Sequence, residues 1–158
     1  MNDIERRPNR LPWPPMLYVS AIALAVLANL AYTLPWLTPP LSEMLFAVGW
    51  LLVAAVVAID VSAMRTLMRA RTTILPHRGA DHLVTGGPFS FSRNPIYLAN
   101  TLLMIGVGLI SGIAWFILFA VAAAFVTQKL AIEREERHLE QRFGKRYRDY
   151  RKKVRRWI

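Results

Sequence analysis

Two polar motifs, separated by a long apolar stretch, carry the side chains in this sequence that could do chemistry. In the first, a Gly-Gly-Pro turn within Leu83–Tyr97 leads into the sequence Arg-Asn-Pro-Ile-Tyr at 93–97. The second is the acidic pair Glu135-Glu136. A helix N-terminus beside an arginine binds anions, because its backbone N–H groups are free and the dipole favours negative charge. The first motif therefore predicts an anion-binding turn, and the acidic pair is the second candidate for a ligand contact.

The turn before the first motif has residues that favour a defined backbone shape. Gly86-Gly87 permits positive φ and a close approach of the backbone to a ligand. We expect Ser92 to cap a helix that begins near Arg93, with Pro95 in its first turn. The alternative without a ligand is a capped helix that enters the membrane, with Arg93 reaching to lipid headgroups.

The acidic pair lies on an expected helix that Gly144 ends. Adjacent side chains on a helix point about 100° apart, so only one of Glu135 and Glu136 can point fully at a site. The alternative is an ordinary solvated helix, with Glu133 paired with Arg137 and with Glu136 and Glu140 merely solvated. The aromatic residues Phe143, Tyr147 and Tyr150 follow at spacings of three and four, and we expect them to clamp the tail against the rest of the protein.

The apolar residues are grouped in long runs, although the chain has only 158 residues, of which 54% are hydrophobic. Met16–Leu34, Met44–Ile59 and the 35 residues of Asn94–Gln128 contain no charged side chain. A bilayer-spanning helix needs about 20 mainly apolar residues. The sequence therefore predicts an all-α membrane protein with a single domain, residues 1–158.

We expect about four transmembrane helices, because Asn94–Gln128 is too long for one span and Ser111-Gly112 is a natural break. The expected elements are two N-terminal spans and a helical hairpin, with a cytosolic loop and a cytosolic amphipathic tail. Their ranges are 16–37, 41–64, 95–110 and 113–130 for the spans, 65–94 for the loop and 131–158 for the tail.

The net charge of +10 follows the spans rather than forming a nucleic-acid surface. All 20 Lys and Arg residues lie before the first span, within 65–93, or from Lys129 onward. This is the positive-inside pattern, which predicts cytosolic N- and C-termini and a basic surface facing membrane lipids. We therefore expect a multi-pass protein, in a bacterial inner membrane, with no nucleic-acid partner.

Both motifs, in this order and spacing, resemble the isoprenylcysteine carboxyl methyltransferase family of integral-membrane methyltransferases, over roughly residues 60–158. The resemblance implies S-adenosylmethionine as cofactor and a lipophilic or small-molecule methyl acceptor. It implies that the first glutamate of the pair lies against the cofactor. The cofactor-binding residues expected from the resemblance are Asp81, His82, Leu83, Val84, Phe89, Arg93, Asn94, Pro95, Ile96, Tyr97, Glu135 and Glu136.

The sequence departs from the family pattern in two places. Where the loop of the family can carry a histidine, this chain has Asp81, with His82 beside it. Where eukaryotic members have an arginine that binds the prenylcysteine carboxylate, four residues before the first glutamate, this chain has Ala131. The acceptor therefore need not be a prenylated protein C-terminus. An isoprenylcysteine-like carboxylate stays open, and a thiol, a small lipophilic molecule or a lipid amine fits equally well.

Two other functions remain open at the level of the sequence. One is a non-enzymatic small membrane protein, and the other is a nicotinamide-dependent reductase of a related membrane fold. No cysteine is present, and no cluster of His, Asp or Glu has metal-ligand spacing, so we expect no metal. Nothing in the sequence identifies a catalytic base or an oligomeric state.

Overall fold

The computed structural model describes residues 13–70 and 82–158. These residues form α-helices, one 3₁₀ turn and one π-helical turn, with no strand among them. The elements in chain order are α1 (Trp13–Ala31), α2 (Leu41–Arg69), η2 (Gly87–Ser90), α3 (Pro95–Ser111), α4 (Ala114–Thr127), η3 (Gln128–Ile132), α5 (Glu133–Phe143) and α6 (Lys145–Lys153). The all-helical prediction is confirmed for the described residues.

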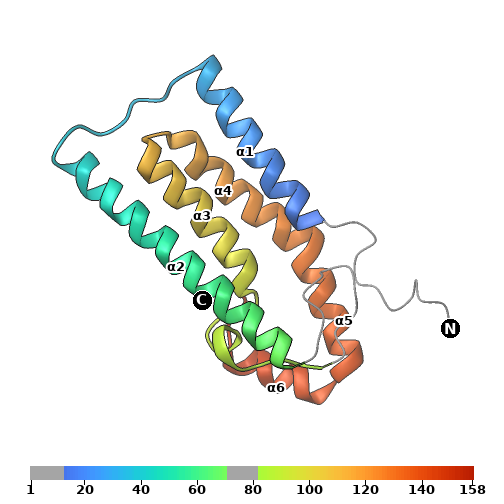
Figure 1. Cartoon of the computed structure of the whole chain (residues 1–158). Helices are drawn as coiled ribbons and strands as arrows, with labels where there is room; N and C mark the ends of the chain where they lie inside the picture. The colour runs from blue at the N-terminus through green and yellow to red at the C-terminus, as the bar shows by residue number, and fades with distance from the viewer. Residues whose placement is uncertain (1–12, 71–81) are drawn as a thin grey trace.

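Four apolar helices lie side by side, and α5 and α6 lie at one end of them (Figure 1). Helix α3 packs between α2 and α4, and α1 packs against α4. Helices α1, α2 and the continuous helix Ala114–Phe143 are long and apolar enough to cross a membrane, whereas α3 has 17 residues. Three of the four predicted spans therefore correspond to helices that are long enough to cross a membrane. The fourth, the hairpin arm formed by α3, is shorter.

The predicted boundaries hold at the hairpin and fail at the ends of the first two spans. The break falls at Gly112, with φ of 69°, where a left-handed residue ends α3. The first helix stops at Ala31 instead of residue 37, because Pro35 follows closely and a helix cannot pass through a proline without losing a hydrogen bond. The second helix continues beyond residue 64 to Arg69, since no glycine or proline interrupts it there.

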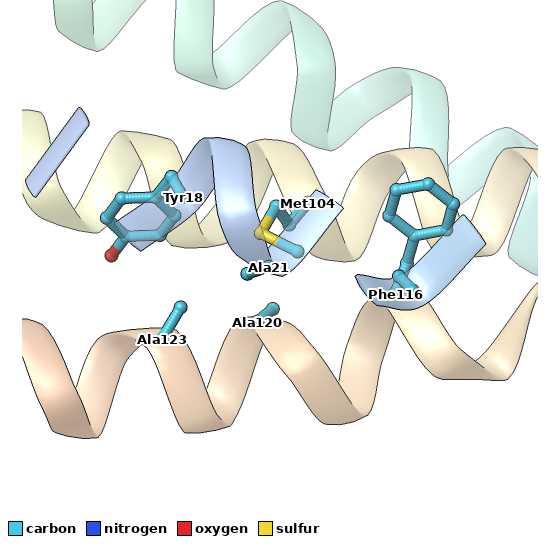
Figure 2. Packing of buried hydrophobic residues seen from close by; sticks show 7 residues of the cluster. Tyr18, Ala21, Met104, Phe116, Ala120 and Ala123 are labelled. Atoms are coloured by element: carbon cyan, nitrogen blue, oxygen red, sulfur yellow. The ribbon is translucent and has the colours of Figure 1, made fainter. Parts of the chain in front are cut away.

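Small residues bring the apolar helices close together. A Cβ atom added to Gly49 would lie 2.7 Å from Ile110 Cγ1 and 2.8 Å from the Gly106 carbonyl oxygen, so α2 and α3 approach nearly backbone to backbone. Between α1 and α4, a buried cluster around Ala21, Ala120 and Ala123 does the same (Figure 2). Packing of small residues is the usual way that membrane helices associate.

The last part of the chain forms two short helices and an extended end. The apolar helix continues without a break into α5 and ends at Gly144, with φ of 53°, as the sequence predicts. Helix α6 ends at Lys153, and Val154 is extended, so the expected helical tail to residue 158 is shorter than predicted. Tyr147, Tyr150 and Val154 are buried together, which confirms that the tail aromatics clamp it to the rest of the protein.

Candidate functional site

The turn before α3 docks on the end of α2. Gly87 has φ of 59°, and a Cβ atom there would lie 2.5 Å from Thr66 Oγ1. Only glycine fits this position easily, because it needs both a left-handed backbone and the space that a side chain would take. The predicted close approach of the backbone thus occurs at Gly87, against a threonine of α2, whereas a Cβ on Gly86 would meet no atom within 4 Å.

The start of α3 differs in detail from its prediction. Helix α3 begins at Pro95 and its N-cap residue is Asn94, which makes no capping bond with its side chain. Ser92 lies before the N-cap position, and its Oγ atom accepts a hydrogen bond from the Asn94 N–H at 3.1 Å. Both polar side chains are buried. The expectation that Ser92 caps the helix is therefore wrong, although Pro95 is at the first helical position as expected.

The C-terminal end of the chain crosses this turn. Donors of the turn point at carbonyl groups of the C-terminal end. Arg93 N–H donates to Arg155 O at 3.0 Å, and Asn94 Nδ2 donates to Arg156 O at 3.0 Å. Ser92 Oγ also contacts Arg156 O, at 3.4 Å. Residues more than 60 positions apart in sequence thus complete each other's hydrogen bonds at the base of α3.

Glu136 is the central charge of this region. Its side chain is 11% exposed and lies 3.0 Å from Arg93 Nη2. Arg156 adds two hydrogen bonds, from Nε to Oε1 at 3.0 Å and from Nη2 to Oε2 at 2.8 Å. Those bonds raise the pKa of Arg156 above its ordinary value. Glu136 therefore joins the turn, α5 and the C-terminal end, and it is not the solvated helix residue of the alternative interpretation.

Glu135 faces a different partner. Tyr97, in the first turn of α3, donates a hydrogen bond from its hydroxyl to Glu135 Oε1 at 2.7 Å. The two neighbouring carboxylates thus both turn toward the start of α3, one to Tyr97 and one to Arg93. The expectation that only one of them could point at this region is wrong, because each contacts a separate residue of the same turn.

A π-helical turn lies between the apolar helix and this acidic pair. It spans Gln128–Ile132, and Ala131 and Ile132 within it are fully buried. Gln128 Oε1 accepts a hydrogen bond at 2.9 Å from Trp157 Nε1 at the end of the chain. Single π turns inside α-helices occur frequently at functional sites. Here the turn lies just before Glu135 and Glu136.

A cleft of about 790 Å³ opens on the tail side of the region. Its walls come from the loop before α3 and from α5 and α6, and they include His82, Leu83, Thr85, Ser90, Phe143, Arg146, Asp149, Tyr150, Lys153 and Val154.

Tyr150 fixes the loop by donating from its hydroxyl to Phe89 O at 2.6 Å. The buried ring of Tyr147 packs on Tyr150, and burial, then the nearby Glu136, raise the pKa of Tyr147 to about 12. Tyr147 therefore links the cleft to the carboxylate network.

The predicted site residues fall into two groups. The first group is connected by the contacts above, either directly or through the C-terminal end, and consists of Arg93, Asn94, Tyr97, Glu135 and Glu136. Pro95 is buried at the start of α3. His82 and Leu83 line the cleft, Phe89 is tied to α6, and Val84 and Ile96 are half-buried. Asp81 lies outside the described residues.

Sequence reasoning missed two residues of the network. Arg156 was one cation among many in a basic tail, and no local pattern distinguishes it from its neighbours. Tyr18, in the first apolar helix, donates a hydrogen bond to Tyr97 O at 3.2 Å. A tyrosine in an apolar run looks like an ordinary packing residue, so only the fold reveals this contact.

Three of the described helices are long and apolar enough to cross a membrane, and the polar, hydrogen-bonded candidate site lies at one end of the helices. Comparison with family models then identifies the kind of protein: residues 44–146 match the phospholipid methyltransferase model. The chain belongs to the phospholipid methyltransferase family, a family of membrane methyltransferases, in agreement with the resemblance found in the motifs. No curated protein matches the sequence. The matched region contains both motifs but neither α1 nor the C-terminal residues 147–158.

Proposed function

We propose that this protein transfers a methyl group from S-adenosylmethionine to a small or lipophilic acceptor at the cytosolic edge of a membrane. The observation that carries the proposal is the hydrogen bond between Tyr97 and Glu135, 2.7 Å long. It joins the two motifs of the family resemblance across 38 residues of sequence, at the end of apolar helices. A carboxylate in that position can hold the ammonium or the ribose hydroxyls of the cofactor.

The side chains present fit a zwitterionic nucleoside. The Arg93 side chain is 9% exposed and pairs with Glu136 through Nη2. Its Nε and Nη1 atoms make no geometric hydrogen bond within residues 13–70 and 82–158, although the guanidinium also interacts with the Tyr147 hydroxyl, and these remaining donors suit a ligand carboxylate. Glu135 supplies the opposite charge. When bound, S-adenosylmethionine carries an electrophilic methyl group on a sulfonium. The protein must hold the acceptor in line with that group and exclude water.

Two observations favour a lipid amine over a prenylcysteine carboxylate as the acceptor. Ala131, at the position of the carboxylate-binding arginine, is fully buried, and the nearby Lys129 is half-exposed and paired with Glu133 at 2.9 Å. Ala131 has no charge, and the Lys129 ammonium already has Glu133 as its counter-ion. The phospholipid methyltransferase match points in the same direction.

In the proposed orientation, both termini lie on the cytosolic side of a bacterial inner membrane. The polar end formed by α5, α6 and the turn before α3 then receives the soluble cofactor from the cytosol. A lipophilic acceptor reaches the same end through the bilayer. The basic residues of the tail face anionic headgroups.

Isothermal titration of the purified protein in detergent with S-adenosylmethionine tests the proposal. We expect saturable binding by the parent and a loss of at least about tenfold in affinity for Glu135→Gln, since a hydrogen bond to a charged group contributes about 1.5–3 kcal/mol. The matched control is Glu140→Gln on the same helix, whose carboxylate pairs with exposed Arg151 at 3.0 Å; its affinity should equal the parent's.

The other functions give different results in the same titration. A non-enzymatic protein would show no binding of the methyl donor, and a reductase would bind a reduced nicotinamide nucleotide instead. Incubation with radiolabelled methyl donor then separates acceptors: phosphatidylethanolamine in nanodiscs should be labelled, and a prenylcysteine analogue should not. Labelling of the prenylcysteine analogue as strong as that of the lipid would reject the lipid-amine assignment.

A further inference from the structure

Helix α1 lies outside the region that the family model matches, yet it reaches the candidate site through Tyr18. The side chain of Tyr18 is buried, at 5% exposed, and its ring packs in the cluster that contains Met104, Ala120 and Ala123. Figure 2 shows the ring beside these residues, with its hydroxyl oxygen at the edge of the group. The ring therefore anchors α1 to the rest of the bundle, and the hydroxyl needs polar partners in an apolar environment.

Those partners belong to α3. The Tyr18 hydroxyl lies 2.7 Å from Thr101 Oγ1 and 3.2 Å from Tyr97 O, and its single proton is shared between these two acceptors. Thr101 Oγ1 also donates to Tyr97 O, at 2.9 Å. Two hydroxyl groups thus converge on the backbone carbonyl of Tyr97.

Tyr97 is consequently held at both ends. Its carbonyl is fixed by Tyr18 and Thr101, and its hydroxyl donates to Glu135 at 2.7 Å. A residue whose backbone is fixed by packing and hydrogen bonds places the end of its side chain more precisely. Binding sites lose function when such supporting contacts are removed.

We infer that Tyr18 is a positioning residue of the methyl-transfer site, and that α1 is part of this site. This inference rests on the function proposed above. Tyr18 acts through Tyr97: its hydroxyl fixes the first turn of α3, so that the Tyr97 hydroxyl stays at Glu135 and the carboxylate keeps the direction in which it meets the cofactor.

Tyr18→Phe removes the hydroxyl and keeps the ring. We expect the affinity for S-adenosylmethionine to fall about fivefold, as for the loss of one ordinary hydrogen bond. Thr101→Val removes the second hydroxyl and should have a similar effect. The control is Tyr32→Phe, just beyond the same helix, because Tyr32 is 66% exposed and its hydrogen bonds to the described residues use its backbone: the N–H donates to Ala28 O at 2.8 Å, and the carbonyl accepts from Trp115 Nε1 at 2.7 Å.

A double-mutant cycle with Tyr97→Phe separates positioning from a simple contribution to stability. If Tyr18 acts through Tyr97, the Tyr18→Phe change should lower affinity little further once the Tyr97 hydroxyl is absent. An equal loss in both backgrounds, or an affinity of Tyr18→Phe equal to that of Tyr32→Phe, would overturn the inference while leaving the proposed function intact. Failure of the parent itself to bind the methyl donor would overturn both.

Discussion

The two ends of this molecule are held together in different ways. At the polar end, the turn before α3, α5 and the C-terminal end are joined by short, directed contacts, with Glu136 bonded to Arg93 and Arg156. In the apolar part, α2 and α3 approach through Gly49 and Gly106. Lipid chains are as apolar as leucine, so helices in a membrane gain little from burying large side chains and rely on close packing. The polar end should therefore respond to changes of charge, and the apolar part to changes of volume.

The largest effect is expected at Glu136. Glu136→Gln leaves the buried guanidinium of Arg93 without its counter-charge, and breaking a buried ion pair costs about 3–5 kcal/mol. We expect the midpoint of thermal unfolding, followed by circular dichroism in detergent, to fall by many degrees.

A control on the same helix sharpens this comparison. Glu133→Gln removes a partly exposed carboxylate that pairs with Lys129 at 2.9 Å and lies 3.8 Å from Arg156 Nη1, and such surface pairs contribute about 0–1 kcal/mol. Equal unfolding midpoints for Glu136→Gln and Glu133→Gln would show that the ion pairs around Glu136 do not hold the polar end.

A smaller effect is expected from volume in the apolar part. In Gly49→Ala the new methyl group would meet Ile110 Cγ1 at 2.7 Å and the Gly106 carbonyl at 2.8 Å. The helices must separate, which costs about 1–3 kcal/mol for overpacking. Gly86→Ala is the matched change at the polar end, where the methyl group has open space and φ is −98°. Unfolding in a denaturing detergent should show lower stability only for the change at Gly49, and a loss at Gly86 as large as at Gly49 would refute this view of the packing.

The smallest effect is expected at Tyr150. Tyr150→Phe removes the hydroxyl that donates to Phe89 O at 2.6 Å and keeps the ring against Tyr147. One hydrogen bond of this kind contributes about 1 kcal/mol. Limited proteolysis of the loop around Phe89 should become a few times faster, with Tyr32→Phe as the unchanged reference; equal cleavage rates would show that this bond does not restrain the loop.

Much of the fold could be predicted because the signals are local. Apolar runs of spanning length determine the helices, and Gly112 and Gly144 end them where the sequence indicates. The errors have local causes as well: Pro35 ends the first helix before residue 37 is reached, and no comparable residue stops the second helix at residue 64.

The site was predictable only in part. Tyr97 and Glu135 each belong to a recognisable motif, but the hydrogen bond between them is visible only in the fold. The roles of Arg156 and Tyr18 depend on contacts with residues 20 to 83 positions away, and neither belongs to a motif. Glu136 resembles an ordinary helix-surface residue in sequence, and its burial results from the C-terminal end folding back across the turn.

Hydrogen–deuterium exchange with and without S-adenosylmethionine tests the central claim most directly, namely that the start of α3 and the start of α5 form one binding site. We predict slower exchange on addition of the cofactor in peptides covering 82–97 and in those covering 131–136, with no change in the first half of α2, and loss of both effects in Glu135→Gln. Protection of only one of the two segments, or protection confined to α6, would contradict the account.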